Sequence, residues 1–338
     1  MVPEKPWGLV TSSSILRACE SRYAQLQPWL LAISVLSGVS NVERRAAIRR
    51  TWFRFIPGSN IIACFGVGGR SDALLREGRS HRDILLLNAT AAATGSMYET
   101  SFGWWLSAAR HFRRATFYAK TDDDAFLHIP RLEVYLRSLE CTTALHFGHL
   151  VYASQNPHTG WRCIWGRGWD PWGYKESRCA AGGAHPPVPY AIGALVVLSR
   201  AVARWMAHSK EVGRAATTII DRGGRCARVS QGKAYGCGED AHVGFWASRA
   251  PMEVTYVRAN WQVVHDLHCG AKAGSSAFPA SVPTNLSIVV HKLKEASAME
   301  YIWDVFVGGQ VHNVTTCEAS TRPKRIAREL PTRGKRGE

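Results

Sequence analysis

Apolar and polar positions alternate along the first 120 residues in a way that predicts strands and helices in turn. Four mainly apolar runs have the length of buried strands: 29–36, 60–65, 83–87 and 116–119. Between them, apolar side chains recur three and four residues apart, which predicts a short helix at 72–79 and a long one that carries Tyr98 to Phe112. Strands that alternate with helices are typical of a doubly wound, parallel α/β sheet.

Two short segments in this region carry turn and capping signals. Ser40-Asn41-Val42-Glu43 has the spacing of a capping box, and it predicts the start of a helix that carries Ile48, Arg49 and Trp52. Gly66-Val67-Gly68-Gly69 follows the second strand and predicts a flexible turn. Such a turn either approaches a nucleotide or only reverses the chain.

Three consecutive acids, Asp122 to Asp124, follow the fourth strand and Lys120. A helix with Pro130 in its first turn follows them, so the segment predicts strand, acidic loop and helix. Carboxylates at the carboxyl end of such a strand lie at the edge of the sheet where open α/β folds bind ligands. Because adjacent carboxylates repel one another, we interpret the loop as a metal site. The alternative is an exposed acidic turn that caps the next helix.

The second half of the chain has a different composition. Residues 141–189 are rich in Trp, Gly, Arg and Pro without a clear period, and we interpret them as a substrate-type loop region. Its Trp residues serve either as sugar-stacking platforms or as loop anchors. The elements predicted after it are a strand at 189–199, a helix at 201–208, a Gly-rich basic loop, a helix from Glu239 to Trp246, and strands at 254–257 and 286–291.

The composition excludes a disordered protein. It does not by itself identify the anionic molecule that the positive charge would bind. The 338 residues are 46% apolar, include thirteen Trp and carry a net charge of +16. Such a charge suits nucleic acid, acidic glycans or anionic cosubstrates, but it is scattered and no nucleic-acid motif accompanies it, so we expect no nucleic-acid partner. We expect a loose arm at 1–28 and a basic, disordered tail at 321–338.

Cysteines and sequons bear on the compartment. The nine Cys include no C-x-x-C pair, which argues against zinc. Sequons at Asn88, Asn285 and Asn313 are compatible with a secretory route, in which some cysteines would pair. No run reaches the roughly 18 apolar residues of a membrane span, and Met1 begins no visible signal peptide.

Six motifs in order resemble the β-1,3-galactosyltransferase and β-1,3-N-acetylglucosaminyltransferase family, which is inverting, of GT-A type, and forms glycosyltransferase family 31. The match covers nearly the whole chain. The motifs are Arg45-x-x-Ile48-Arg49-x-Thr51-Trp52, Asp83-Ile84, Lys120-x-Asp122-Asp123-Asp124, Pro189-Tyr190-x-x-Gly193-x-x-x-x-Leu198-Ser199, Glu239-Asp240-x-x-Val243-Gly244 and His291.

The resemblance implies one GT-A catalytic domain at 29–320, in which a Rossmann-like nucleotide-sugar-binding half at 29–140 merges with an acceptor-binding half at 141–320. It implies Mn²⁺ as cofactor, a UDP-sugar donor, a glycan or glycoprotein acceptor, and a place on the lumenal side of the Golgi membrane. The family's N-terminal membrane anchor is not visible in this chain.

The resemblance also assigns the residues that bind the donor and its metal. Asp124 would ligate the ion, and His291 is the matching late histidine; His265 and His268 are competitors. Asp122 and Asp123 would orient the ribose and metal-bound waters. Arg45 and Arg49 belong to the same donor-binding set, with Arg49 pairing with the diphosphate or, alternatively, serving as a buried structural partner.

For the transfer itself, Asp240 matches the family's catalytic base, and Glu239 would hold backbone or acceptor hydroxyls. The alternative is that both acids only cap the following helix. The expected activity is transfer of galactose from UDP-galactose to a glycan with a β-1,3 linkage, as part of protein glycosylation. A UDP-N-acetylglucosamine-dependent enzyme and an inactive glycan-binding relative are the alternatives. Ala191 and the segment 97–100 depart from the family's usual residues, so the acceptor class and the disulfide pattern stay open.

Overall fold

A computed structural model describes residues 28–87, 97–155, 162–165, 188–221, 238–259, 262–267 and 283–308. The predicted basic tail, most of the N-terminal arm, His268 and the sequons at Asn88 and Asn313 lie outside these residues. Among the described helices, none is long and apolar enough to cross a membrane.

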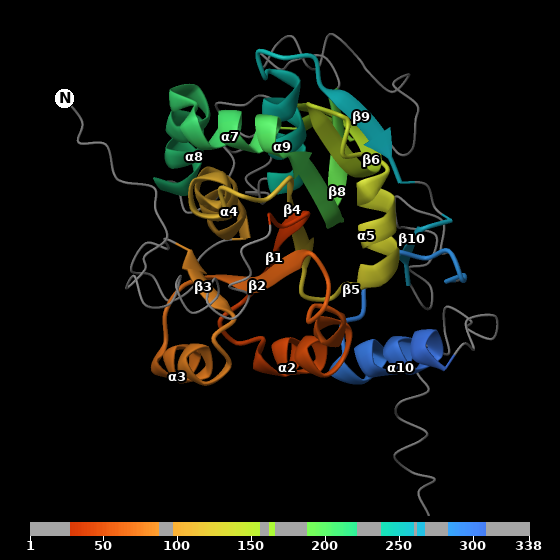
Figure 1. The fold of residues 1–338 in the computed structure, drawn as a ribbon. Coiled ribbons are helices and arrows are strands. Elements are labelled where there is room, and N and C mark those ends of the chain that lie inside the picture. Colours follow the sequence, from red (N-terminus) through yellow and green to blue (C-terminus); the bar gives the residue numbers. More distant parts are fainter. Residues whose placement is uncertain are drawn as a thin grey trace, which may run out of the picture.

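The first half of the main sheet is parallel, as predicted. Its strands run in the order β3-β2-β1-β4, and β1 lies between β2 and β4 with parallel pairing to both. Figure 1 shows β1, β2 and β4 in the middle of the molecule and β3 toward its left side. The four strands are β1 (Leu31–Ser37), β2 (Ile61–Gly68), β3 (Ile84–Leu87) and β4 (Phe117–Asp122).

The second half of the sheet is mainly antiparallel. β8 (Val188–Ser199) pairs with β4, β6 (Leu145–Gln155) pairs with β8, and β7 (Arg162–Trp165) pairs with β6. β9 (Thr255–Arg258) adds to β6 in parallel. The predicted α/β fold, with a Rossmann-like half joined to a second half, is confirmed.

The interpretation of residues 141–189 as irregular loop is wrong for β6 and β7. β6 reads Leu-His-Phe-Gly-His-Leu-Val, and its histidines His146 and His149 are buried although the sequence gives them as polar interruptions. Their presence in the core hides the strand pattern. Residue 140 lies between α5 (Ile129–Arg137) and β6. The division into a donor-binding half before it and an acceptor-binding half after it stays a prediction.

Helices cover both faces of the sheet. Alternate residues of β1 enter two cores: Ile33 and Val35 pack with one, and Ala32 packs with the other. The first core includes α2 (Val42–Arg50), the 3₁₀ turn Trp52–Phe55, α3 (Asp72–His81), α5 and α10 (Ala296–Val307). The second includes α4 (Met97–His111), α7 (Arg200–His208), α8 (Lys210–Asp221) and α9 (Glu239–Ser248), which lie together in the upper part of Figure 1.

A small second sheet brings the end of the chain to the acidic loop. β10 (Val264–Asp266) pairs in parallel with β11 (Val289–His291). β11 pairs antiparallel with β5 (Phe126–Leu127), which begins two residues after Asp124. The strand predicted at 286–291 is therefore present but shorter, while β5, β10, α8 and α10 were not predicted.

Two local predictions near the sheet edge are wrong. Gly66 and Gly68 belong to β2 and do not form a flexible turn; a Cβ on Gly66 would lie 2.3 Å from Ser34 Oγ, so this glycine allows β1 and β2 to pack. The expected capping box at Ser40 is also absent. The N-cap residue of α2 is Asn41, whose side chain makes no capping bond because it binds Asp123 instead.

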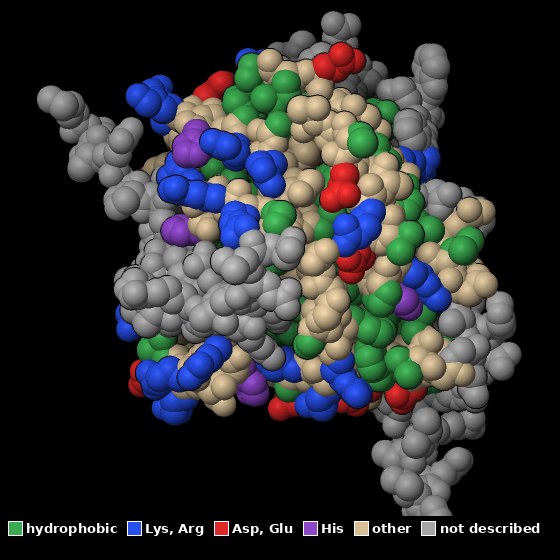
Figure 2. Space-filling model, in the orientation of Figure 1, with side chains coloured by type: hydrophobic (Ala, Val, Ile, Leu, Met, Phe, Trp, Pro, Cys, Tyr) green, Lys and Arg blue, Asp and Glu red, His purple; other side chains and the backbone are tan. Residues whose placement is uncertain are grey.

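The positive charge is distributed over the surface. Figure 2 shows Lys and Arg side chains in several separate groups on one face, with His and acidic side chains between them. On this face the charge follows no single helix or continuous band, which agrees with its scatter along the sequence.

Candidate active site

Two acids of the acidic loop and His291, at the end of β11, form a compact group of possible metal ligands. Asp122 ends β4, Asp124 follows in the turn before β5, and His291 ends β11. One ligand atom from each of these three residues lies within 4.8 Å of the others. Nε2 of His291 is 3.1 Å from Asp124 Oδ1 and 3.5 Å from Asp122 Oδ2.

His291 is held so that its second ring nitrogen faces the two acids. Its Nδ1 lies 2.6 Å from Asp266 Oδ1, a bond that fixes the orientation of the ring. Its Nε2 is buried, is not satisfied by a regular hydrogen bond from or to the described residues, and faces the carboxylates of Asp124 and Asp122. A buried imidazole nitrogen without a partner, next to two carboxylates, fits a divalent ion that accepts mixed oxygen and nitrogen ligands.

The competing histidine lies outside this group. His265 precedes Asp266 on β10, and its Nε2 lies 2.6 Å from Ser287 Oγ. Because successive residues of a strand point to opposite faces, Asp266 faces His291 and His265 faces away from it. The geometry therefore favours His291 as the second ligand; His268 lies outside the described residues.

The charges around the group are strongly coupled. Burial alone would lower the pKa of His291, but Asp122, Asp124 and Asp266 raise it to about 10. Burial alone would raise the pKa of Asp124, but His291 and Lys294 hold it well below its usual range. Nζ of Lys294 forms an ion pair with Asp124 Oδ2, so a half-exposed ammonium lies at the rim of the group.

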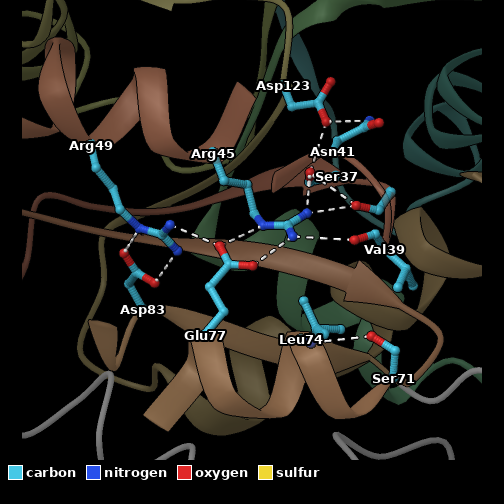
Figure 3. Close-up of polar contacts among 11 residues, drawn as sticks. Ser37, Val39, Asn41, Arg45, Arg49, Ser71, Leu74, Glu77, Asp83 and Asp123 are labelled. Atoms are coloured by element: carbon cyan, nitrogen blue, oxygen red, sulfur yellow. Dashed lines mark hydrogen bonds and ion pairs between the residues drawn. The ribbon is translucent and has the colours of Figure 1, made fainter. Parts of the chain in front are cut away.

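Asp123 points away from the other two acids and fastens the loop to the end of β1. Its Oδ2 accepts hydrogen bonds from Ser37 Oγ and Asn41 Nδ2, both at 2.7 Å, and its Oδ1 accepts one from Arg44 Nη1 at 3.0 Å. Figure 3 shows this connection to Ser37 and Asn41. Its assignment to the ribose or to metal-bound water stays a prediction.

Arg45 and Arg49 form a network with Glu77 of α3 and with Asp83, which directly precedes β3 (Figure 3). Arg45 donates to both oxygens of Glu77, at 2.9 and 2.7 Å, and Arg49 donates to both oxygens of Asp83, at 2.8 Å each. Arg45 is fully buried, so in this conformation it cannot reach a ligand. For Arg49 the geometry favours the alternative of a structural partner over a contact with the diphosphate.

A groove lies beside the acidic loop, between α2 and α10. Its volume is about 490 Å³. Asn41 and Arg44 line it on one side and Lys294 and Ser297 on another, and three of these four contact the acids of the loop. The groove therefore lies next to the residues that bind Asp123 and Asp124, and its walls carry acidic groups (Glu43, Glu295 and Glu300) as well as amide and cationic groups.

The second pair of acids lies in the first turn of α9. Glu239 is buried; its Oε1 pairs with Lys120 Nζ, and its Oε2 accepts a hydrogen bond from Ser101 Oγ at 2.7 Å. Asp240 is half-buried, and among the described residues its hydrogen bond comes from the backbone N–H of Ala241 at 3.0 Å. The N-cap position belongs to Gly238, so neither acid occupies it.

Two glycines let β8 approach both groups of acids. A Cβ on Gly193 would lie 2.6 Å from Asp122 Oδ2, and a Cβ on Gly244 would lie 2.2 Å from Tyr190 Cβ. β8 therefore packs directly against the acidic loop on one side and against α9 on the other. This explains why the two motifs contain glycine at these positions.

Sequence reasoning missed Asp266 and Lys294. Asp266 stands at the end of the short strand β10, and only the pairing of β10 with β11 places it beside His291. Lys294 follows His291 by three residues, a spacing that carries no signal by itself. The sequence signal for Asp266 was its place in Val-Val-His-Asp-Leu-His, but there His265 and His268 were considered as ligands and the acid was not.

Comparison with known proteins identifies relatives. The model of the family named Galactosyltransferase matches residues 43–218. β-1,3-galactosyltransferase GALT1 of Arabidopsis thaliana is 29% identical over 150 residues, which are 40% of this chain and 22% of that protein. The lactosylceramide 1,3-N-acetyl-β-D-glucosaminyltransferase of Rattus norvegicus is 30% identical over 131 residues, 34% of either protein. These matches thus span between about a fifth and a third of the curated relatives.

Among solved structures, the galactosyltransferase LgtC in complex with donor and acceptor sugar analogs is similar at a TM-score of 0.44 and 11% identity, over 90% of this chain and 98% of that one. The family match is the stronger finding. It extends over more than half of the residues and contains α2 from its second residue, the acidic loop and β8. The chain belongs to the galactosyltransferase family.

Proposed function

We propose that this chain is an inverting hexosyltransferase that moves galactose from UDP-galactose to a glycan acceptor and forms a β-1,3 linkage, in protein glycosylation. The observation that carries the proposal is the meeting of Asp122, Asp124 and the unpartnered Nε2 of His291 in a member of this family. Asp124 and His291, with Asp122 beside them, would hold Mn²⁺, which as a Lewis acid supplies stabilisation of charge on the diphosphate.

Asp240 is the base in this proposal. Its carboxylate takes the proton of the acceptor hydroxyl while that oxygen forms a bond to the anomeric carbon of the sugar. On the opposite face, the bond from the anomeric carbon to UDP breaks and leaves its electron pair on the diphosphate oxygen. Asp240 suits this role better than Glu239, because both oxygens of Glu239 are already engaged by Lys120 and Ser101.

The donor is tested by a screen of UDP-sugars. Purified protein with Mn²⁺ is given UDP-galactose, UDP-N-acetylglucosamine or UDP-glucose, with and without a glycan acceptor, and UDP release is measured; the linkage of any product is determined by NMR. We expect acceptor-dependent release from UDP-galactose. Preference for UDP-N-acetylglucosamine would support the alternative that the name of the rat relative suggests. UDP binding without release from any donor would support the alternative of a catalytically inactive relative.

For the compartment we propose the lumenal side of the Golgi membrane. Two features support an oxidising, glycosylating compartment: Cys64 is disulfide-bonded, and Asn285 of the sequon Asn285-Leu286-Ser287 is exposed in a turn. Treatment of the protein from secretory cells with an N-glycosidase should increase its gel mobility, and Asn285→Gln should reduce that change.

A further inference from the structure

Lys120 is a fully buried cation between the two groups of acids. It lies on β4, two residues before Asp122, and its side chain has no exposed surface. Its Nζ pairs with Glu239 Oε1 of α9 and lies 3.7 Å from Asp122 Oδ1. We call Asp122, Asp124 and His291 the metal side and Glu239 and Asp240 the acceptor side. The ammonium group of Lys120 therefore faces one carboxylate of each side.

The partner of Lys120 is held in place from a second element as well. The second oxygen of Glu239 is held by Ser101 Oγ from α4, at 2.7 Å. The carboxylate of Glu239 is thus fixed from two elements, β4 and α4, and it cannot rotate without leaving a buried charge without its partner.

The position of Glu239 determines the position of Asp240. Both residues lie in the first turn of α9, so a shift of the Glu239 backbone moves Asp240 with it. Lys120 and Asp122 are two residues apart on one strand and point to the same face of the sheet. β8 packs against Asp122 at Gly193 and against α9 at Gly244, which closes the arrangement of β4, β8 and α9.

We infer that Lys120 is a positioning residue: through Glu239 it sets the place of the first turn of α9, and so of Asp240, relative to Asp122 and the metal side. Lys120 itself touches no substrate. The inference rests on the proposed function, because it takes Asp240 as the base. A misplacement of about 1 Å between a base and its substrate can lower a rate by about 100-fold, so a residue that fixes this distance affects turnover strongly.

The competing explanation is that Lys120 and Glu239 form a buried ion pair that only stabilises the fold. A double-mutant cycle separates the two explanations. Lys120→Met leaves Glu239 buried without its partner and should lower the melting temperature, whereas the double variant K120M/E239Q removes both charges and should recover most of the loss. Gln at position 239 can still accept the hydrogen bond from Ser101.

Four quantities are measured in K120M, E239Q and the double variant: melting temperature, Mn²⁺-dependent UDP affinity, kcat and the acceptor KM. We expect the double variant to bind UDP within about threefold of wild type while its kcat is lower by about 10- to 100-fold. Because Lys120 acts through Glu239, kcat of the double variant should equal that of E239Q within about threefold. The control R137M/E133Q removes an ion pair on the exposed side of α5 and should leave all four quantities unchanged.

Recovery of both melting temperature and wild-type kcat in the double variant would overturn the inference and leave a structural ion pair. Loss of UDP affinity equal to the loss of kcat would also overturn it, because Lys120 would then serve the donor side. A wild-type protein that transfers no sugar from any donor would refute the proposed function, and the inference with it. An active wild type with a fully active double variant would refute the inference alone.

Discussion

At the scale of single residues, Asp124 is held between two nitrogen groups. One of its oxygens faces Nε2 of His291 and the other faces Lys294, while its carboxylate is almost fully buried. A buried carboxylate with such neighbours stays ionised and binds positive groups. Asp122 and Asp123 differ from it, because one packs against β8 and the other binds the end of β1.

The first prediction follows from that charge. Asp124→Asn keeps the shape of the side chain but removes the negative charge that balances a divalent ion, so Mn²⁺-dependent UDP affinity should fall by at least about tenfold. Titration calorimetry with UDP in the presence of Mn²⁺ measures it, with Asp304→Asn on the exposed side of α10 as control. Unchanged affinity in Asp124→Asn would refute the metal assignment.

A second prediction compares two buried histidines. His291→Ala removes the Nε2 that faces the acids, so the Mn²⁺ concentration needed for half-maximal UDP binding should rise by about 10- to 100-fold. His265→Ala removes a hydrogen bond to Ser287 and should lower the melting temperature without this rise. The opposite pattern, a higher Mn²⁺ requirement in His265→Ala only, would show that His265 is the ligand.

The third prediction concerns Asp240. As a base it must accept a proton, so Asp240→Asn should retain donor and metal binding while kcat falls by about 10²–10⁴-fold. If Asp240 served only the start of α9, Asn would replace it with little loss, because the two residues are about equally good there. Turnover within about threefold of wild type at saturating substrates would exclude Asp240 as the base.

At the scale of elements, a network of two arginines and two acids joins α2 to α3 and to the residue that precedes β3: Arg45, Glu77, Arg49 and Asp83. Through Ser37 the network reaches Asp123. The network thereby supports the end of β1, where Ser37 holds the acidic loop through Asp123. Burial alone would raise the pKa of Glu77, but hydrogen bonds from Arg45 and Arg49 outweigh burial and lower it from 4.5. Glu77 therefore stabilises the fold above pH 4.5, and this contribution is lost as the pH falls through the lowered pKa.

The fourth prediction is that Glu77→Gln lowers the free energy of unfolding by about 1–3 kcal/mol at pH 7, because two arginines lose a charged partner. The difference from wild type should shrink as the pH falls below 4.5, where wild-type Glu77 also becomes protonated. Urea unfolding at pH 7 and pH 3.5 measures it, with Glu211→Gln on the surface of α8 as control. An equal difference at both pH values would contradict the role of the charge.

Elements differ in how far the sequence predicts them. β1 to β4 are buried on both faces, so apolar runs identify them directly. In α8, Val212, Ala215 and Ile219 follow the helical period, but Gly213 and two adjacent Thr residues mask it. β10 has three residues, and a strand this short is specified by its pairing with β11 and not by its own pattern.

At the scale of the whole molecule, the candidate site lies where the parallel half of the sheet meets the antiparallel half. β4 carries the acids and pairs with β1 on one side and with β8 on the other. The sequence identified the acidic loop, His291 and the Glu239-Asp240 pair as separate motifs. Their contacts join residues more than a hundred positions apart, and such contacts depend on sheet order and helix packing, which no local pattern contains.

The last prediction uses this long-range connection. If an ion joins the acidic loop to β11, binding should stabilise the folded chain by mass action, by about 2.7 kcal/mol when the free ligand is at 100 times its Kd. For a domain of this size that corresponds to a rise in Tm of several degrees, on the order of 2–4 °C per kcal/mol. The rise should require Mn²⁺ and UDP together and disappear with EDTA, because the diphosphate and the protein share the ion. Differential scanning fluorimetry with UDP alone, Mn²⁺ alone and both measures it, and an equal rise with UDP and EDTA would show that the nucleotide binds without the metal.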